Sequence, residues 1–200
     1  MRLAPLALVA LASCAPSLTL PPPAVPSGEW DEGLAQPVAV AEIPTGAALV
    51  RHDFDTLTGY TRRLVTTHKG VYTGWVQKPQ LSFFALTRGT ARPAAMPSVV
   101  ALVFRTLEPD AVTGPRLVLG CGATADTVPL ATASHVAPTG NTHSHFLTYL
   151  LPTARIARFA NCNAGDLQVG QTRVHFDGLE LGGLRALLFD LGATRLAAGT

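Results

Sequence analysis

This chain contains few charged residues and no long apolar run, and both shortages limit what it can be. Asp, Glu, Lys and Arg make up 14% of its 200 residues, whereas about a quarter is usual in globular proteins. The basic residues form no dense patch, since Arg62 and Arg63 are the only adjacent pair, and a nucleic-acid partner is therefore not expected. No segment reaches the ~18 consecutive apolar residues that a transmembrane helix needs. With 48% hydrophobic residues, the chain can nevertheless bury a substantial core.

Sequence motifs of the common enzyme classes are also missing. The chain has no Gly-x-Ser-x-Gly elbow, no His-Glu-x-x-His, no Cys-x-x-Cys, no Walker loop and no complete Gly-x-Gly-x-x-Gly, the patterns that position nucleophiles, metals or phosphates. The adjacent pairs Ser134-His135 and Ser144-His145 cannot form their own nucleophile–base contact, because neighbours in a strand point to opposite faces. The sequence therefore predicts a protein that is not an enzyme.

The N-terminus carries the most specific pattern in the chain. Arg2 precedes a short apolar run, Leu6–Leu11, which the small residues and cysteine of Ala12–Cys14 follow. That order is typical of a secretion signal. A cysteine directly after small residues resembles the lipobox of bacterial lipoproteins. The resemblance implies that residues 1–13 are a cleaved signal peptide and that Cys14 becomes a lipidated N-terminus. It covers only these residues, and an ordinary secretion signal cut nearby is the alternative.

Residues 14–44 are expected to tether a domain to the lipidated cysteine. Prolines occur at positions 16, 21, 22, 23, 26, 37 and 44, and such density favours extended polyproline II without a packed core. Trp30 interrupts this segment within Gly28–Glu32. A tryptophan in a tether is expected to dock, either on the chain's own domain or on a protein partner.

Two cysteines remain when Cys14 is set aside. Cys121 and Cys162 would form a disulfide in an oxidising compartment, closing a loop of about 40 residues. Two buried free thiols or a single reactive nucleophile are the alternatives, since sequence alone does not place the two Cα atoms within bonding range.

Residues 45–192 are expected to form one β-rich domain, and residues 193–200 a frayed tail. Alternating and β-branched segments separated by turn residues predict strands, and an apolar stripe spaced by three and four residues predicts helices. The expected strands are 62–67, 71–77, 80–87, 98–107, 116–121, 127–136, 143–151, 166–169 and 172–177. The expected helices are 153–160 and 181–191.

These elements indicate an α+β fold that is mainly antiparallel β. About eight or nine strands at this spacing suggest a β-sandwich-like domain, with the two short helices in its C-terminal third. Residues 62–67 and 71–77 are expected to pair as a hairpin around Lys69-Gly70, and residues 98–107, apolar on both faces, to form a central covered strand.

Histidines near the ends of two predicted strands suggest one metal site. His143 and His145 share a face of their strand, as do His175 and Asp177 of theirs. If those strands were neighbours, the four side chains could hold a transition metal such as zinc or copper. The alternative is that all four are solvated surface residues. A second ligand hypothesis is an aromatic groove, with Tyr60, Tyr72, Trp75 and Tyr149 as its candidates.

Together these observations suggest an exported lipoprotein that acts without a cofactor. We expect an accessory, assembly or binding subunit of a cell-envelope complex, attached to the membrane through Cys14 and bound to an envelope protein. Ala15 follows the cysteine, whereas in enterobacteria an aspartate there resembles an inner-membrane retention signal, so the periplasmic face of the outer membrane is favoured. The alternative is a periplasmic protein that binds a metal or small ligand through its histidines.

Overall fold

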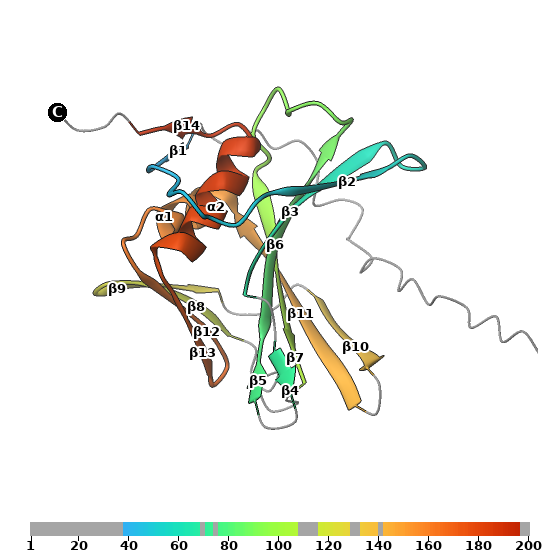
Figure 1. The fold of residues 1–200 in the computed structure, drawn as a ribbon, viewed down its shortest axis with the longest axis vertical. Coiled ribbons are helices and arrows are strands. Elements are labelled where there is room, and N and C mark those ends of the chain that lie inside the picture. The colour runs from blue at the N-terminus through green and yellow to red at the C-terminus, as the bar shows by residue number, and fades with distance from the viewer. Residues whose placement is uncertain are drawn as a thin grey trace, which may run out of the picture.

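The computed structural model describes residues 38–68, 71–73, 76–107, 116–128, 133–139 and 142–196. Cys14, Trp30 and the tether up to residue 37 lie outside these ranges, as do residues 197–200. The described residues form two larger antiparallel sheets, two helices and two short strand pairs (Figure 1). The predicted fold class, α+β and mainly antiparallel β, is confirmed.

The larger sheet has six strands in the order β10-β11-β7-β6-β3-β2, and every neighbouring pair is antiparallel. Its strands are β2 (Arg51–Asp55), β3 (Tyr60–His68), β6 (Gln80–Arg88), β7 (Val99–Thr106), β10 (Ala133–Thr139) and β11 (Thr142–Pro152). The expectation for residues 98–107 is confirmed in position, since β7 lies between β11 and β6 in the interior of this sheet.

The smaller sheet has four strands in the order β13-β12-β8-β9. Its strands are β8 (Leu117–Cys121), β9 (Thr124–Val128), β12 (Gly165–Val169) and β13 (Thr172–Phe176). Gly170 and Gln171 join β12 to β13, between the strands expected at 166–169 and 172–177, and Gly170 adopts a φ of 56° there, a conformation that a residue without Cβ reaches without strain.

Both helices lie where the apolar spacing predicts them. Helix α1 (Thr153–Ala160) has the predicted bounds, and α2 (Gly178–Asp190) begins three residues before the predicted start at Leu181. The early start has a local cause, because the Asp177 carboxylate accepts hydrogen bonds from the backbone N–H groups of Leu179 and Glu180. The Glu180 side chain accepts one from the Asp177 N–H in return, which completes a capping box.

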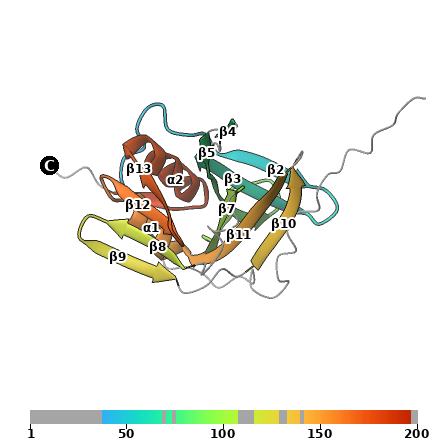
Figure 2. The same cartoon turned by 90° about the horizontal axis from the view of Figure 1, so that it is seen from below.

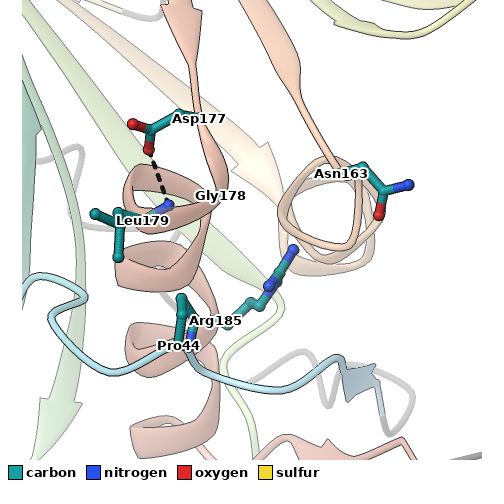
Figure 3. Close-up of a pocket in the computed structure, with 6 residues that line it drawn as sticks. All are labelled: Pro44, Asn163, Asp177, Gly178, Leu179 and Arg185. Carbon is teal, nitrogen blue, oxygen red and sulfur yellow. Dashed lines mark hydrogen bonds between the residues drawn. The ribbon is translucent and has the colours of Figure 1, made fainter.

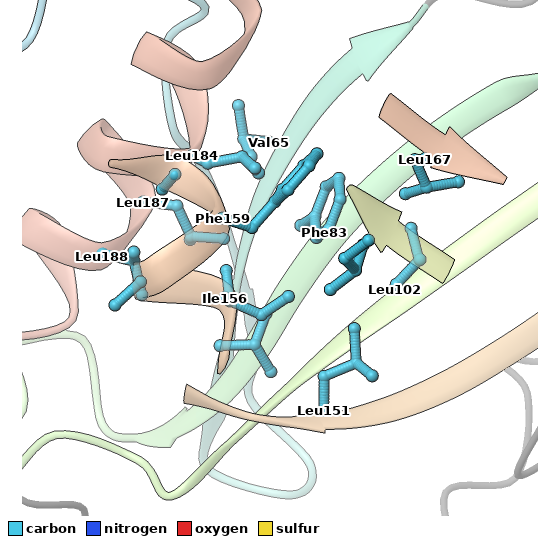
Figure 4. Packing of buried hydrophobic residues seen from close by; sticks show 14 of the residues in the cluster. Val65, Phe83, Leu102, Leu151, Ile156, Phe159, Leu167, Leu184, Leu187 and Leu188 are labelled. Atoms are coloured by element: carbon cyan, nitrogen blue, oxygen red, sulfur yellow. The ribbon is translucent and has the colours of Figure 1, made fainter. Parts of the chain in front are cut away.

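The core lies between the six-stranded sheet and the layer formed by the two helices and the smaller sheet (Figure 2). Phe83 of β6 and Leu102 of β7 point toward side chains from both helices and from β12 (Figure 4). Those side chains are Ile156, Phe159, Leu184, Leu187, Leu188 and Leu167. The helices therefore close one face of the larger sheet.

The boundaries predicted for the domain are wrong at both ends. Val38 and the residues after it belong to the folded unit, because β1 (Ala39–Val40) pairs in parallel with β14 (Thr194–Arg195). The Asn161 side chain fixes this segment by accepting from the Ala41 N–H and donating to the Ala39 carbonyl. Neither strand is visible in the sequence pattern, because each is two residues long and its partner lies at the opposite end of the chain.

Two strand predictions also need correction. The segment 127–136 is not one strand, since β9 belongs to the smaller sheet and β10 to the larger; Pro129 between them lacks the N–H that a continuous ladder requires. The predicted hairpin of 62–67 with 71–77 does not form. Strand β3 pairs with β2 and β6, while β4 (Val71–Thr73) pairs with β5 (Val76–Lys78), because the nine residues of β6 offer β3 a longer ladder.

Close packing across α2 gives a first prediction, for Gly182→Ala. A Cβ at Gly182 would lie 2.6 Å from Cδ of Pro44 and 3.0 Å from Cβ of Ala47. Alanine normally stabilises a helix interior by ~1 kcal/mol relative to glycine, but here we expect a net loss of about 1–3 kcal/mol from overpacking. Urea denaturation measures it. Gly178→Ala is the matched control, since its Cβ meets nothing within 4 Å; equal effects of the two substitutions would contradict the packing argument.

Candidate functional site

The predicted disulfide between Cys121 and Cys162 is confirmed, with Cα atoms 5.9 Å apart. It joins the end of β8 to the segment that follows α1, and so ties the smaller sheet to the helical layer. Cys162 is buried and Cys121 is half-buried. Neither residue is a free nucleophile, and the bond is a structural crosslink.

The structure does not bring the predicted metal ligands together. His143 and His145 lie on β11 of the larger sheet, whereas His175 lies on β13 of the smaller sheet. The condition behind the prediction, that these strands are neighbours, is therefore not met. Among the described residues, no group of three or more His, Cys, Asp or Glu side chains could hold a metal ion.

His175 and Asp177 have local partners instead. His175 Nδ1 lies 3.1 Å from Oδ1 of Asp166 on the neighbouring strand, and Arg173 donates to the other oxygen of the same carboxylate at 2.7 Å. The hydrogen bond from Arg173, with a smaller one from His175, holds the pKa of Asp166 below its usual value. Asp177 is engaged as the N-cap of α2. These are surface and capping contacts that stabilise β13 and the start of α2.

An open pocket of about 440 Å³ lies at the start of α2 (Figure 3). It is lined by Pro44, Asn163, Asp177, Gly178, Leu179 and Arg185. The Arg185 guanidinium donates to the carbonyls of Ala160, Cys162 and Glu42, and burial lowers the pKa of this arginine. The Asp177 carboxylate already occupies the position that an anion would take at the helix start. The two charged groups of the pocket, Asp177 and Arg185, thus stabilise the fold.

A second polar network surrounds Arg63, which is 1% exposed. Its guanidinium donates to Oδ2 of Asp190 at 2.7 Å, to the Thr87 hydroxyl at 2.9 Å and to the Ala91 carbonyl at 2.6 Å. His52 Nε2 lies 2.9 Å from the same Asp190 oxygen. The network ties β2, β3 and β6 to the last turn of α2. Burying the Arg63 charge costs desolvation free energy, and its hydrogen bonds and ion pair offset that cost. Arg63 therefore has a structural role in joining these elements.

Three exposed apolar side chains lie in or beside the turn between β2 and β3. Leu57 is 96% exposed, Phe54 is 46% exposed and Tyr60 is 42% exposed. The hairpin extends outward on the side away from β9 (Figure 1), and Asp55 is the last residue of β2, paired with Tyr60 at the start of β3. We call Phe54, Leu57 and Tyr60 the apolar tip.

Hydrogen bonds within the turn hold the apolar tip in place. The Asp55 carboxylate accepts from the Leu57 N–H and from the Thr58 hydroxyl, and the Asp55 carbonyl accepts from the Gly59 N–H. The hydrogen bond from Leu57 is the main reason that the pKa of Asp55 lies below its usual value. The carboxylate therefore stays ionised at neutral pH, and its contacts are lost only as the pH falls through that lowered pKa.

The proposed aromatic groove is not formed by the described side chains. Tyr149 is fully buried in the core, and burial raises the pKa of its hydroxyl, whereas Tyr60 is exposed at the apolar tip. The side chain of Tyr72 and the whole of Trp75 lie outside the described residues. Sequence reasoning missed the apolar tip, because Arg51–Asp55 lacks an apolar alternation; Asp55 and Gly59 were the available turn signals.

No known protein family, no curated protein and no solved structure matches this chain. In the part of the chain that the structure describes, neither helix is long and apolar enough to cross a membrane.

Proposed function

We propose that this protein is a lipid-anchored lipoprotein of the cell envelope that acts as a non-catalytic accessory subunit. The Leu6–Cys14 pattern supports the anchor, since a cysteine placed directly after an apolar run and small residues resembles a lipobox. One thioether-linked diacylglycerol and one amide-linked chain would hold the protein on a bilayer, because two chains suffice for stable attachment.

One observation on the domain supports a non-catalytic role. The buried charged groups that the structure describes are held by backbone carbonyls or by one another: Arg185 by three carbonyls, and Arg63 by Asp190 and its neighbours. An active site instead keeps titratable groups poised in a cleft, with a position left for the substrate. These side chains serve the fold, which favours a protein that works by holding or positioning another component.

The length of the tether limits the distance between the domain and the bilayer. Residues 15–37 lie between the proposed lipidated cysteine and Val38, the first residue that the structure describes. At ~3.1 Å per residue an extended proline-rich chain of that length reaches roughly 70 Å. The domain can therefore act at the bilayer surface or some distance into the periplasm, and the outer membrane is the favoured location.

Cys14→Ser tests this proposal in cells. We expect the wild-type chain in the membrane fraction with fatty acid on residue 14 by mass spectrometry, and the serine variant in the soluble fraction with normal stability. Crosslinking and gentle detergent extraction of the wild type should recover a stoichiometric envelope protein. Membrane attachment that survives Cys14→Ser, or a wild-type chain recovered alone after crosslinking, would overturn the anchor or the accessory role respectively.

A further inference from the structure

The small size of the apolar tip restricts the kind of partner that it can bind. Leu57 lies in the turn and is almost fully exposed, whereas Phe54 and Tyr60 stand at the adjoining strand ends, on opposite faces of the hairpin. A stable interface between proteins buries about 800 Å² on each side and involves roughly 20 residues or more. Three side chains on a convex turn are far too few for that, whereas a bilayer accepts a small projecting apolar group at any point of its surface.

The chemistry of the turn also suits a lipid surface. Leu57 stands at its apex, and the aromatic rings of Phe54 and Tyr60 lie at its base; amphipathic rings such as tyrosine concentrate at membrane interfaces. The exposed cation Arg88 lies opposite Tyr60 in the register of β3 and β6, a position from which it can meet anionic headgroups.

Two backbone N–H groups of the turn already have hydrogen-bond acceptors within the chain. Unpaired N–H groups are costly where water is scarce, and here the N–H groups of Leu57 and Gly59 both donate to Asp55. The Gly59 carbonyl accepts from the Gly89 N–H. These N–H groups therefore stay satisfied when the turn enters the headgroup region, where the ionised Asp55 carboxylate remains among polar headgroups while Leu57 reaches further in.

We propose that the β2–β3 hairpin inserts the apolar tip into the surface of the bilayer that carries the lipid anchor. The inference rests on the proposed function, since three apolar side chains alone bind a membrane weakly and a second signal makes such binding stable. The anchor supplies that signal by keeping the turn at a high local concentration beside the bilayer. Two contacts, Cys14 and the apolar tip, would then fix the orientation of the domain.

An environment-sensitive fluorophore on Thr56→Cys tests the insertion. Thr56 is exposed and adjacent to Leu57, so the label reports on the apolar tip without replacing it. The full lipidated chain is reconstituted into vesicles of phosphatidylethanolamine and phosphatidylglycerol. We expect a blue-shifted emission that nitroxide-bearing acyl chains quench. The same label on Gln171→Cys, in the exposed turn between β12 and β13, should show neither effect.

Two exposed leucines provide matched variants. Leu57→Asp should lower the inserted fraction of the Thr56→Cys reporter roughly tenfold or more, because the transfer of one leucine side chain is lost. Leu49→Asp places the same charge at a leucine that is 89% exposed before the start of β2, and it should leave the signal unchanged. Equal thermal stability of the two variants shows that the fold is intact.

The outcomes separate this inference from the anchor itself. Mass spectrometry of the same sample reports acylation of residue 14. If the chain is not acylated, the Cys14 thiol is coupled to a maleimide lipid. The emission and quenching of the Thr56→Cys label are then measured in the same vesicles. An unshifted reporter on an anchored chain overturns insertion while the anchor stands. A shift that requires native membranes and is absent in pure lipid would overturn it too, because the apolar tip would then bind a protein.

Discussion

Arg63→Met is expected to lower the free energy of unfolding by about 3–5 kcal/mol, the usual effect of breaking a buried ion pair from one side. The guanidinium donates to Asp190, to the Thr87 hydroxyl and to the Ala91 carbonyl, and methionine satisfies none of them. Asp190 is the last residue of α2, where the helix dipole already disfavours a negative charge. The variant therefore leaves the Asp190 carboxylate at an unfavourable helix end, with His52 as its nearest remaining side-chain partner. Urea denaturation at neutral pH measures the loss.

Arg62→Met is the matched control for this prediction. Arg62 is the next residue along β3, but its side chain is 39% exposed and pairs with Asp53 at the surface. Such pairs contribute about 0–1 kcal/mol, so this variant should remain close to the wild type. Similar losses for the two arginines would show that the Arg63 network does not stabilise the fold as argued.

A second substitution separates the ion pair from the other contacts. Asp190→Asn removes the negative charge at the end of α2 while keeping its shape. In the Arg63→Met background it should restore part of the lost stability, because the carboxylate has then lost its arginine partner and lies at the negative end of the helix dipole. Additive losses from the two substitutions would instead mean that Arg63 acts mainly through Thr87 and Ala91.

Sequence periodicity predicted the elements whose stabilising contacts are local or whose faces are covered on both sides. The bounds of α1 follow from Ile156, Phe159 and Ala160, which form one apolar side and are all buried. β7 was predicted from its two apolar faces and lies inside the six-stranded sheet. In α1 the burial follows the helical period, and in β7 successive residues are buried because both faces of the strand are covered, so the local pattern was sufficient in both elements.

Pairing over long distances in the chain could not be predicted in this way. β1 and β14 are each two residues long, and their contact joins residues about 155 positions apart; no local pattern marks a ladder of that kind. The prediction of a metal site was wrong for the same reason. His143 and His145 do lie on one strand, but Asp177 lies beyond the end of β13, and whether two strands are neighbours depends on the topology of the whole fold.

The apolar tip was missed for a different reason. The β2 sequence, Arg-His-Asp-Phe-Asp, has the polarity of a loop, since only Phe54 is apolar. Its strand forms because β3 offers a ladder and because Asp53 pairs with Arg51 and Arg62 across the strand surface. Exposed apolar residues such as Leu57 do not contribute to a core pattern, and the structure is needed to show that they are held in one place.

Loss of the disulfide is expected to lower the free energy of unfolding by about 4 kcal/mol. The bond joins Cys121 and Cys162, which are 41 residues apart, and it acts mainly by restricting the unfolded chain. Cys121→Ala with Cys162→Ala is the variant to compare with the oxidised wild type. Urea denaturation measures the difference, and the midpoint should fall with little change in the folded baseline.

The folded state should survive this double substitution because a second set of contacts holds the same segment. Arg185 donates to the carbonyls of Ala160 and Cys162, and these bonds do not involve sulfur. Near-ultraviolet circular dichroism of the variant should therefore match the wild type in the absence of urea, apart from the disulfide band. A lost near-ultraviolet spectrum would mean that the disulfide positions α1 in the native state, and that Arg185 alone cannot.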